Sequence, residues 1–477
     1  MNIISSQLFI GGRFRLASEI EPVIEAATGE RLGDGASATE AEIAEAVAAA
    51  RDALPQWRSS TPAERAEVLV RLAAALRSRA DSTNELVSRE NGMPIVLSAA
   101  VNGIVPPALF KYYAKLITET AEEEIRPSYL GHTIVRREAV GVVAAITPWN
   151  YPQGLAVMKL APALAAGCTV VLKAPPETAL DAMVFAEAAV EAGLPAGVLN
   201  VVPGGAAAGG FLVEHPGIDK VAFTGSTATG RRIAEICGGL MRPVTLELGG
   251  KSAAIILDDA DLDVTMQGLR ETAFTNNGQT CSLTSRILAP RSRYDEVVEA
   301  LVALTNSLVV GDPLDTRTEI GPLVTSRQRD RVLDYINGGT ANGARLVAGG
   351  SIPTGQSRGW FVSPTVFADV DNSDRLAREE IFGPVVTVTA YDNDESAVDI
   401  ANDTEYGLAG TVWSTDVDRA TDIARNVVTG SIGINCYQND MRAPFGGVKA
   451  SGMGRELGPE GLDAYRTLKS IYRLGSA

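Results

Sequence analysis

The chain has 477 residues, enough for two or three domains, and its 45% hydrophobic and 21% charged residues describe a soluble globular protein. A net charge of −16 argues against binding to nucleic acid or to anionic membrane surfaces, because both need a basic face. No basic region followed by an apolar run opens the sequence, so no secretory signal is expected. The four scattered cysteines predict neither a disulfide framework nor a metal site, and they favour the reduced cytoplasm.

The first 120 residues are expected to be mostly helical. Apolar residues at helical spacing predict helices over 39–54 and 62–80, the second with Thr61 as its cap and Pro62 at its first position. Residues 33–38 match the dinucleotide fingerprint G-x-G-x-x-A, but no convincing strand precedes them. We therefore interpret this segment as a turn before a helix cap.

An extended pattern with central turn residues predicts a hairpin over residues 122–139. The hairpin suits either an oligomer contact or a solvent-facing flap, and the sequence does not decide between them. Residues 465–474 alternate like a strand, which we expect to pair with the hairpin of a neighbouring subunit.

Strands and helices alternate regularly between residues 141 and 247. The predicted strands are 141–147, 169–173, 198–202, 220–224 and 244–247, and the predicted helices are 154–166, 179–192, 206–214 and 228–237. This order predicts a doubly wound parallel sheet that binds ligands at the carboxyl ends of its strands. Residues 155–172 are very apolar, but Lys159 and Pro162 interrupt them, so no membrane span is expected.

Turn motifs follow three of these strands, at residues 147–150, 173–176 and 223–227. Gly225 and Ser226 stand where a strand gives way to a helix, and backbone N–H groups there can hold a pyrophosphate. A second α/β segment follows Lys251, with possible strands at 253–257, 286–289, 345–348 and 385–390. Residues 444–452 are too rich in glycine for a regular element and predict a loop that closes over something.

Cys281 is the candidate nucleophile, because it lies between small polar residues that leave a thiol accessible to a ligand. The chain has only two histidines, His132 and His215, which makes a cysteine–histidine dyad improbable. Carboxylates are the obvious alternative bases for such a thiol.

Seven motifs together resemble the aldehyde dehydrogenase superfamily, in its non-acylating branch, over nearly the whole chain. They are Pro148-Trp149-Asn150-Tyr151-Pro152, Lys173, Phe223-Thr224-Gly225-Ser226, Leu246-Glu247-Leu248-Gly249-Gly250-Lys251-Ser252, Asn277-Gly278-Gln279-Thr280-Cys281, Glu380-Ile381-Phe382-Gly383-Pro384 and Pro444-Phe445-Gly446-Gly447. The resemblance implies an α/β fold with a Rossmann-like dinucleotide-binding domain (1–120 and 140–249) and an α/β catalytic domain (250–450). It also implies a small β oligomerisation flap (121–139 and 455–477).

The resemblance further implies oxidation of an aldehyde to a carboxylic acid. Cys281 would form a thiohemiacetal, hydride would pass to a nicotinamide, and Glu247 would activate the water that hydrolyses the thioester. The Asn150 amide and the Cys281 N–H would form the oxyanion hole. The implied catalytic residues are Cys281, Glu247, Asn150 and Lys173, and the implied cofactor-binding residues are Thr147, Pro148, Trp149, Lys173, Gly225, Ser226, Leu248, Gly249, Glu380 and Phe382.

Two departures from the family pattern leave specificity open. Pro176 stands where many members have the glutamate that grips the adenosine ribose, so NAD is favoured but NADP is possible. Met158 and Asn439 replace aromatic tunnel residues of some members, so their aldehyde specificity is not carried over. A homodimer or homotetramer is expected. The alternatives are a CoA-acylating dehydrogenase, which the glutamate at 247 disfavours, and a catalytically silent structural relative.

Overall fold

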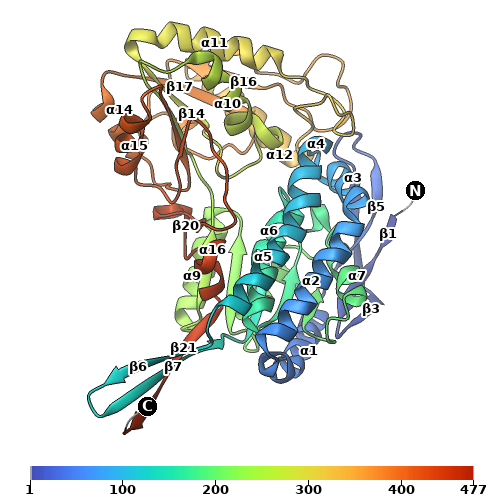
Figure 1. The fold of residues 1–477 in the computed structure, drawn as a ribbon. Coiled ribbons are helices and arrows are strands. Elements are labelled where there is room, and N and C mark those ends of the chain that lie inside the picture. Colours follow the sequence, from blue (N-terminus) through green and yellow to red (C-terminus); the bar gives the residue numbers. More distant parts are fainter. Residues whose placement is uncertain (1–2, 476–477) are drawn as a thin grey trace.

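The computed structural model describes residues 3–475, and Figure 1 shows two lobes from which a β-hairpin projects. The sheet of the first lobe contains β2 (Gln7–Ile10), β3 (Arg13–Leu16), β8 (Val142–Ile146), β9 (Thr169–Lys173), β10 (Leu199–Val201), β11 (Lys220–Thr224), β12 (Val244–Glu247) and β20 (Gly452–Met453). Its order is β20-β12-β11-β8-β9-β10-β2-β3. The strands β8 to β12 are mutually parallel, as predicted, while β20 at one end and β2 and β3 at the other pair antiparallel.

Both faces of this sheet are covered by helices, because the strands are apolar on both sides. In β8, Val143 and Ala145 belong to one core while Val142, Ala144 and Ile146 belong to the other. The first core includes side chains of α2 (Pro62–Ser78), α5 (Val105–Glu119), α6 (Pro152–Ala166) and α7 (Met183–Glu191). The second includes side chains of α1 (Glu40–Ser59), α8 (Ala206–Glu214) and α9 (Thr227–Gly239). The predicted doubly wound arrangement is confirmed.

The N-terminal residues differ from the prediction. The three-stranded sheet β1-β5-β4 is formed by β1 (Ile3–Ser5), β4 (Glu19–Ile24) and β5 (Arg31–Ser37), where mostly helix was expected. The fingerprint-like segment lies largely in strand β5, so the turn predicted there is wrong. β4 and β5 are short and partly exposed, and they lack the apolar alternation that reveals a half-buried strand.

One helical stretch of the first lobe is unusually apolar. After α3 (Ala80–Asn91) and a short turn, α4 (Ile95–Ser98), the π-helix η1 (Ala99–Ile104) and α5 follow one another without a break. Within residues 3–475, only the stretch Ile95–Glu119 is long and apolar enough to cross a membrane, with a mean hydropathy of 1.4. This is a test of length and composition alone, and the core helices of soluble proteins also pass it.

The second lobe is built on a seven-stranded sheet. Its strands are β13 (Ala253–Ile256), β14 (Arg286–Pro290), β15 (Arg345–Ala348), β16 (Thr365–Ala368), β17 (Val385–Tyr391), β18 (Gly410–Trp413) and β19 (Gly433–Ile434), in the order β15-β16-β17-β14-β13-β18-β19. All neighbours are parallel except β15 and β16. The helices are α10 (Leu262–Phe274), α11 (Tyr294–Ser307), α12 (Ser326–Ala341), α13 (Arg375–Arg378), α14 (Asp394–Asn402) and α15 (Val417–Asn426).

The projecting element consists of β6 (Glu123–Ser128), β7 (Gly131–Ala139) and β21 (Arg466–Leu474), and Figure 1 shows it extending away from both lobes. The predicted hairpin and terminal strand are therefore present. The expected partner of the terminal strand is wrong, because β21 pairs along its length with β7 of its own chain. α16 (Gly458–Asp463) leads into β21. The domain boundaries given above stay a prediction.

Candidate active site

The first lobe brings its motif turns to one edge of the sheet. Lys173 pairs with Ile146, Ile146 with Phe223, and Thr224 with Glu247, so β8, β9, β11 and β12 end side by side. From β8 the chain moves first toward β9 and later returns to β11 on the other side. The turns after β8 and β11 therefore flank the switch point, where α/β sheets bind their ligands.

The second lobe contributes loops that precede its strands. Residues 248–252 lead into β13, residues 275–285 into β14 and residues 379–384 into β17. Because neighbouring strands of this sheet are parallel, these loops share its amino-terminal edge. Cys281 lies in the second loop and Glu380 in the third.

Strained backbone shapes the loop that carries Cys281. Asn276 and Asn277 have φ angles of 51° and 61°, a left-handed region that asparagine tolerates better than most residues. The Asn277 side chain donates to the carbonyls of Gly92 (2.9 Å) and Pro322 (2.8 Å). The surrounding structure thus holds the unusual conformation, which is the condition for keeping such strain.

Asn150 is attached directly to this loop. Its buried side-chain amide donates to the carbonyl of Gln279 at 2.9 Å, and Asn276 donates to the Asn150 carbonyl at 2.9 Å. The Tyr151 hydroxyl lies 2.7 Å from Thr280 Oγ1. The structure therefore brings Asn150 and the nucleophile loop together, as predicted from two motifs far apart in the sequence.

The thiol of Cys281 is neutral in this environment. Burial raises its pKa to about 12, helped by the negative charges of Glu380 and Glu247. Both acids are thus close enough to act on the sulfur. The contact with Gly250 is also close, since a Cβ there would lie 2.3 Å from the Cys281 carbonyl.

Glu247 is 2% exposed, and neither carboxylate oxygen has a hydrogen-bond partner within the described residues. Burial, and then the charge of Glu456, raise its pKa well above the usual range. The glycine-rich loop 444–452 closes over it as the sequence suggested. β20 pairs with β12 beside Glu247, and a Cβ at Gly446 would lie 2.5 Å from Glu247 Oε1.

A buried ion pair next to Glu247 was missed by sequence reasoning. Lys159 Nζ donates to Glu456 Oε1 and to Thr224 Oγ1, each at 2.6 Å, and both charged side chains are inaccessible to solvent. The only sign of this pair in the sequence is Lys159 itself, a lysine that interrupts the apolar stretch 155–172. Its partner lies 297 residues away, so local sequence could not identify it.

Glu380 lies against the connection between the lobes. Its Oε1 accepts the N–H of Gly250 at 3.0 Å, and a Cβ on Gly249 would lie 2.4 Å from Oε2. Burial raises its pKa to about 7, opposed by the Gly250 N–H and by Lys251. Phe382, with φ 63°, packs edge-to-face on Trp149 with ring centres 5.4 Å apart. Cofactor residues predicted from both lobes therefore meet, beside a hollow that Gly250, Thr280, Glu380 and Phe382 help to line.

The remaining predicted cofactor residues line the edge of the first sheet. Gly225 N donates to the Glu247 carbonyl, and Ser226 caps α9 by accepting the N–H of Thr229. Lys173 Nζ donates to the Gly204 carbonyl at 2.8 Å, and burial lowers its pKa to about 8. The capped helix start can hold a pyrophosphate, so these residues fit a dinucleotide. The lysine's hydrogen bond to Gly204 favours its cofactor-binding role over its catalytic one.

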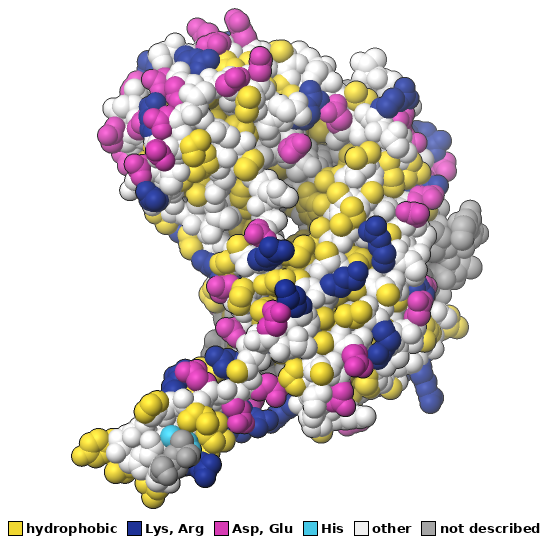
Figure 2. Space-filling model, viewed as in Figure 1, with side chains coloured by type: hydrophobic (Ala, Val, Ile, Leu, Met, Phe, Trp, Pro, Cys, Tyr) yellow, Lys and Arg dark blue, Asp and Glu magenta, His cyan; other side chains and the backbone are white. Residues whose placement is uncertain are grey.

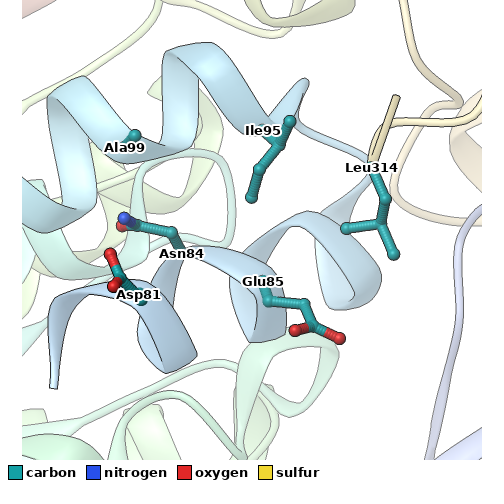
Figure 3. Close-up of a pocket in the computed structure, with 6 residues that line it drawn as sticks. All are labelled: Asp81, Asn84, Glu85, Ile95, Ala99 and Leu314. Carbon is teal, nitrogen blue, oxygen red and sulfur yellow. The ribbon is translucent and has the colours of Figure 1, made fainter. Parts of the chain in front are cut away.

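Another hollow, of about 470 Å³, lies away from these residues. Figure 3 shows it between α3, the α4–η1 helix and Leu314, and it is lined by Asp81, Asn84, Glu85, Ile95, Ala99 and Leu314. None of the predicted site residues borders it. The volume of a hollow is therefore a poor guide to the active site in this protein. The chemistry of the side chains identifies the site instead.

The model of the aldehyde dehydrogenase family matches residues 15–471 of the sequence. The chain belongs to the aldehyde dehydrogenase family. It is 52% identical to geranial dehydrogenase of Castellaniella defragrans, with 100% of both chains covered. It is 39% identical to the chloroplastic betaine aldehyde dehydrogenase of Beta vulgaris, over 99% of this chain and 97% of that one.

Solved aldehyde dehydrogenases have the same fold. The Mycobacterium tuberculosis enzyme complexed with NAD+ is 46% identical, with a TM-score of 0.97 over 100% of this chain and 99% of that chain. A Pseudomonas syringae mutant in complex with NAD+ and octanal is 38% identical, with a TM-score of 0.95 and coverage of 98% and 96%. The predicted family, fold and aldehyde-oxidising reaction class are confirmed. The neighbours with NAD+ support the predicted cofactor, and the CoA-acylating and silent alternatives are not favoured.

Proposed function

We propose that Cys281 is the nucleophile of this aldehyde dehydrogenase, and that Glu247 assists both its activation and hydrolysis of the thioester. The observation that carries the proposal is geometric: the Asn150 amide donates to the carbonyl of Gln279, two residues before Cys281, and Gly249 and Gly250, which follow the strand of Glu247, pack against Glu380 and the Cys281 carbonyl. The test is to supply an aldehyde and NAD without coenzyme A. We expect the carboxylic acid as product, and its absence would contradict hydrolysis.

The first step needs a thiolate, so the thiol proton must leave Cys281. Glu247 suits the role of proton acceptor. Because its pKa is raised, moving a proton to it from the Cys281 thiol, whose pKa is also raised, costs less free energy. Sulfur attack on the aldehyde carbon then gives a thiohemiacetal oxyanion. The Asn150 amide and the Cys281 N–H would stabilise this charge, which is the role of preorganised donors.

Bound NAD supplies the acceptor for the hydride that leaves this adduct. On the nicotinamide side, Glu380 would hold the ribose hydroxyls while Phe382 packs beside the ring. On the adenosine side, the Gly225–Ser226 turn would hold the pyrophosphate and Lys173 the ribose. Thr147, Pro148, Trp149, Leu248 and Gly249 complete the proposed cofactor set.

Hydrolysis of the thioester gives Glu247 its second task, as the base for water. The proton that Glu247 takes from water must then pass to another acceptor. Glu456, paired with Lys159, is the proposed acceptor. Glu456 Oε2 has no hydrogen-bond partner in the described part of the chain, and Glu456 acts electrostatically on Glu247. A buried carboxylate with a free oxygen beside the base can accept such a proton.

We propose NAD over NADP as the acceptor. Pro176 removes the usual carboxylate, but Glu177 follows it, is largely buried and acts on Lys173. Its negative charge near the proposed ribose site disfavours a 2′-phosphate. Glu177→Ala is expected to shift the NAD:NADP ratio of kcat/KM toward NADP by about three- to tenfold. An unchanged ratio would remove Glu177 from this role.

An apolar aldehyde is the proposed substrate class. The 52% identity to geranial dehydrogenase supports it, as does the packing of Cys281 against an apolar core that contains Leu155, Met158 and Phe445. Figure 2 shows a hollow between the lobes with hydrophobic side chains beside it. We expect kcat/KM to be about 100-fold higher for long unsaturated aldehydes than for betaine aldehyde, because a cation loses hydration in such a site. The reverse ranking in a substrate panel would contradict the proposal.

We also propose a homodimer or homotetramer that assembles through the β6–β7–β21 element, in the cytoplasm. The exposed apolar side chains of this element support an interface; they include Tyr129, Leu130, Leu468, Tyr472 and Leu474. Light scattering of the full chain tests assembly. Leu468→Lys with Tyr472→Lys is expected to give monomers, and an unchanged mass would exclude this surface.

A further inference from the structure

A closed ring of buried hydrogen bonds surrounds the loop that carries Asn150. At one side, Asn91 Nδ2 donates to the carbonyls of Trp149 (3.1 Å) and Asn150 (3.3 Å). At the other, Gln153 Nε2 in the first turn of α6 donates to Asp181, to Oδ2 at 2.6 Å and to the carbonyl at 2.8 Å.

Glu90 completes the ring, because it is the chain neighbour of Asn91. Its carboxylate accepts the N–H groups of Leu180 (2.9 Å) and Asp181 (3.2 Å). The end of α3 therefore holds the Asn150 loop through Asn91. Through Glu90 it also holds Leu180 and Asp181, the second of which contacts Gln153. The loop is tied at two points to one helix end.

The ring consists of polar side chains although its members are buried. Glu90, Asn91, Gln153 and Asp181 are each 1% exposed. Burial and then the charge of Asp181 raise the pKa of Glu90 well above its usual range. Buried polar groups fix one arrangement more strictly than apolar packing does, since a shift leaves them without partners.

We propose that Gln153, Asp181 and Glu90 are positioning residues that hold the Asn150 amide at the oxyanion site. The inference rests on the proposed role of Asn150. The amide of Asn150 reaches the nucleophile loop through Gln279, and its carbonyl is held by both Asn91 and Asn276. The ring and the nucleophile loop thus set the position of this one residue from two sides. Breaking the ring moves the oxyanion donor without touching sulfur or cofactor.

The test compares Gln153→Leu, which breaks the ring, with Asp181→Asn, whose side-chain oxygen still accepts from Gln153. Gln153→Leu is expected to lower kcat for the aldehyde about 10- to 100-fold with little change in KM, because small displacements of a catalytic donor have effects of this size. The dissociation constant of NAD and the rate of Cys281 alkylation by iodoacetamide are expected to stay within about twofold, since neither needs the oxyanion donor. Asp181→Asn is expected to retain kcat within about threefold.

Two further variants calibrate the result. Asn200→Ala is a matched control. Asn200 is a buried side-chain amide in β10 of the first lobe; it accepts the N–H of Gly11 and donates to the carbonyl of Gly197, away from the site. It is expected to lose stability while kcat stays within about twofold. Asn150→Ala is the reference, with an expected loss of about 100-fold or more in kcat.

The outcomes separate the inference from the function on which it rests. Normal kcat in Gln153→Leu, beside a large loss in Asn150→Ala, overturns the positioning role and leaves the oxyanion assignment intact. Normal kcat in Asn150→Ala overturns that assignment itself. A parallel loss of kcat, NAD affinity and alkylation in Gln153→Leu would show general damage and also overturn the inference. Gln153→Met, with similar length and no amide, replaces the leucine variant if that variant aggregates.

Discussion

The two lobes build the active site in opposite ways. The first lobe offers turns at the carboxyl ends of parallel strands, where a capped helix start and ordinary backbone can hold a dinucleotide. The second offers loops at the amino-terminal edge of its sheet, and both Asn277 beside the nucleophile and Phe382 have left-handed backbone. In the proposed site, regular structure of the first lobe holds the pyrophosphate, and strained structure of the second lobe presents Cys281 and the nicotinamide-side residue Phe382.

The junction between the two lobes leaves little room for larger side chains. Where they join, Gly249 contacts Glu380 and Gly250 contacts the Cys281 carbonyl so closely that neither position has room for a Cβ. Substitutions at Gly249 and Gly250 should therefore disturb the Cys281 loop and Glu380 together.

The largest expected effect comes from the nucleophile. Cys281→Ala is expected to lower NADH production by about 10,000-fold or more, because the covalent pathway is lost. NAD affinity, measured by quenching of tryptophan fluorescence, is expected to stay within about twofold. Loss of affinity together with activity would contradict the division of labour between the lobes.

Glu247→Gln tests a catalytic role in the first lobe, because Glu247 ends β12 of the first sheet and is the proposed base. Steady-state turnover should fall about 1,000-fold, because a neutral amide cannot act as the base for water. A rapid-quench or stopped-flow trace should still contain a first burst of NADH, slower than in the wild type because the thiol also loses its proposed proton acceptor. If burst and steady state fall equally, Glu247 acts chiefly in activating the thiol.

A methyl group at the junction tests its close packing. Gly250→Ala is expected to destabilise the protein by about 1–3 kcal/mol and to lower kcat/KM about 100-fold, because the Cys281 loop must move. Gly238→Ala in α9 is the matched control, since a Cβ there meets nothing within 4 Å. Thermal unfolding and kinetics should leave the control near wild type; equal effects in both variants would refute the packing argument.

The smallest expected effect concerns pH. Burial raises the pKa of Glu380 from an ordinary value of 4.5 to about 7, so its carboxylate is lost as the pH falls through 7. If the anion holds the nicotinamide ribose, the dissociation constant of NAD should rise about tenfold from pH 8 to pH 6. Glu380→Gln should weaken binding at pH 8 and make it independent of pH over this range. A pH-independent wild type would exclude this role.

Sequence reasoning located the parallel strands of the first sheet because they are buried on both faces and read as short apolar runs. It failed at β4 and β5, whose exposed polar residues carry no such pattern. It found Cys281, Glu247 and Glu380 because their motifs are local. It missed the Lys159–Glu456 pair and the ring around Asn150, because these are contacts between segments that only folding brings together.

The segment that closes over Glu247 sets the order in which a newly made chain becomes competent. Both main sheets are largely complete in sequence before residue 444, yet Gly446, β20 and Glu456 supply the surroundings of the base. During synthesis the lobes have time to form while this last stretch is still inside the ribosome. We therefore expect a chain that ends before residue 444 to lack the surroundings of Glu247 and to be inactive.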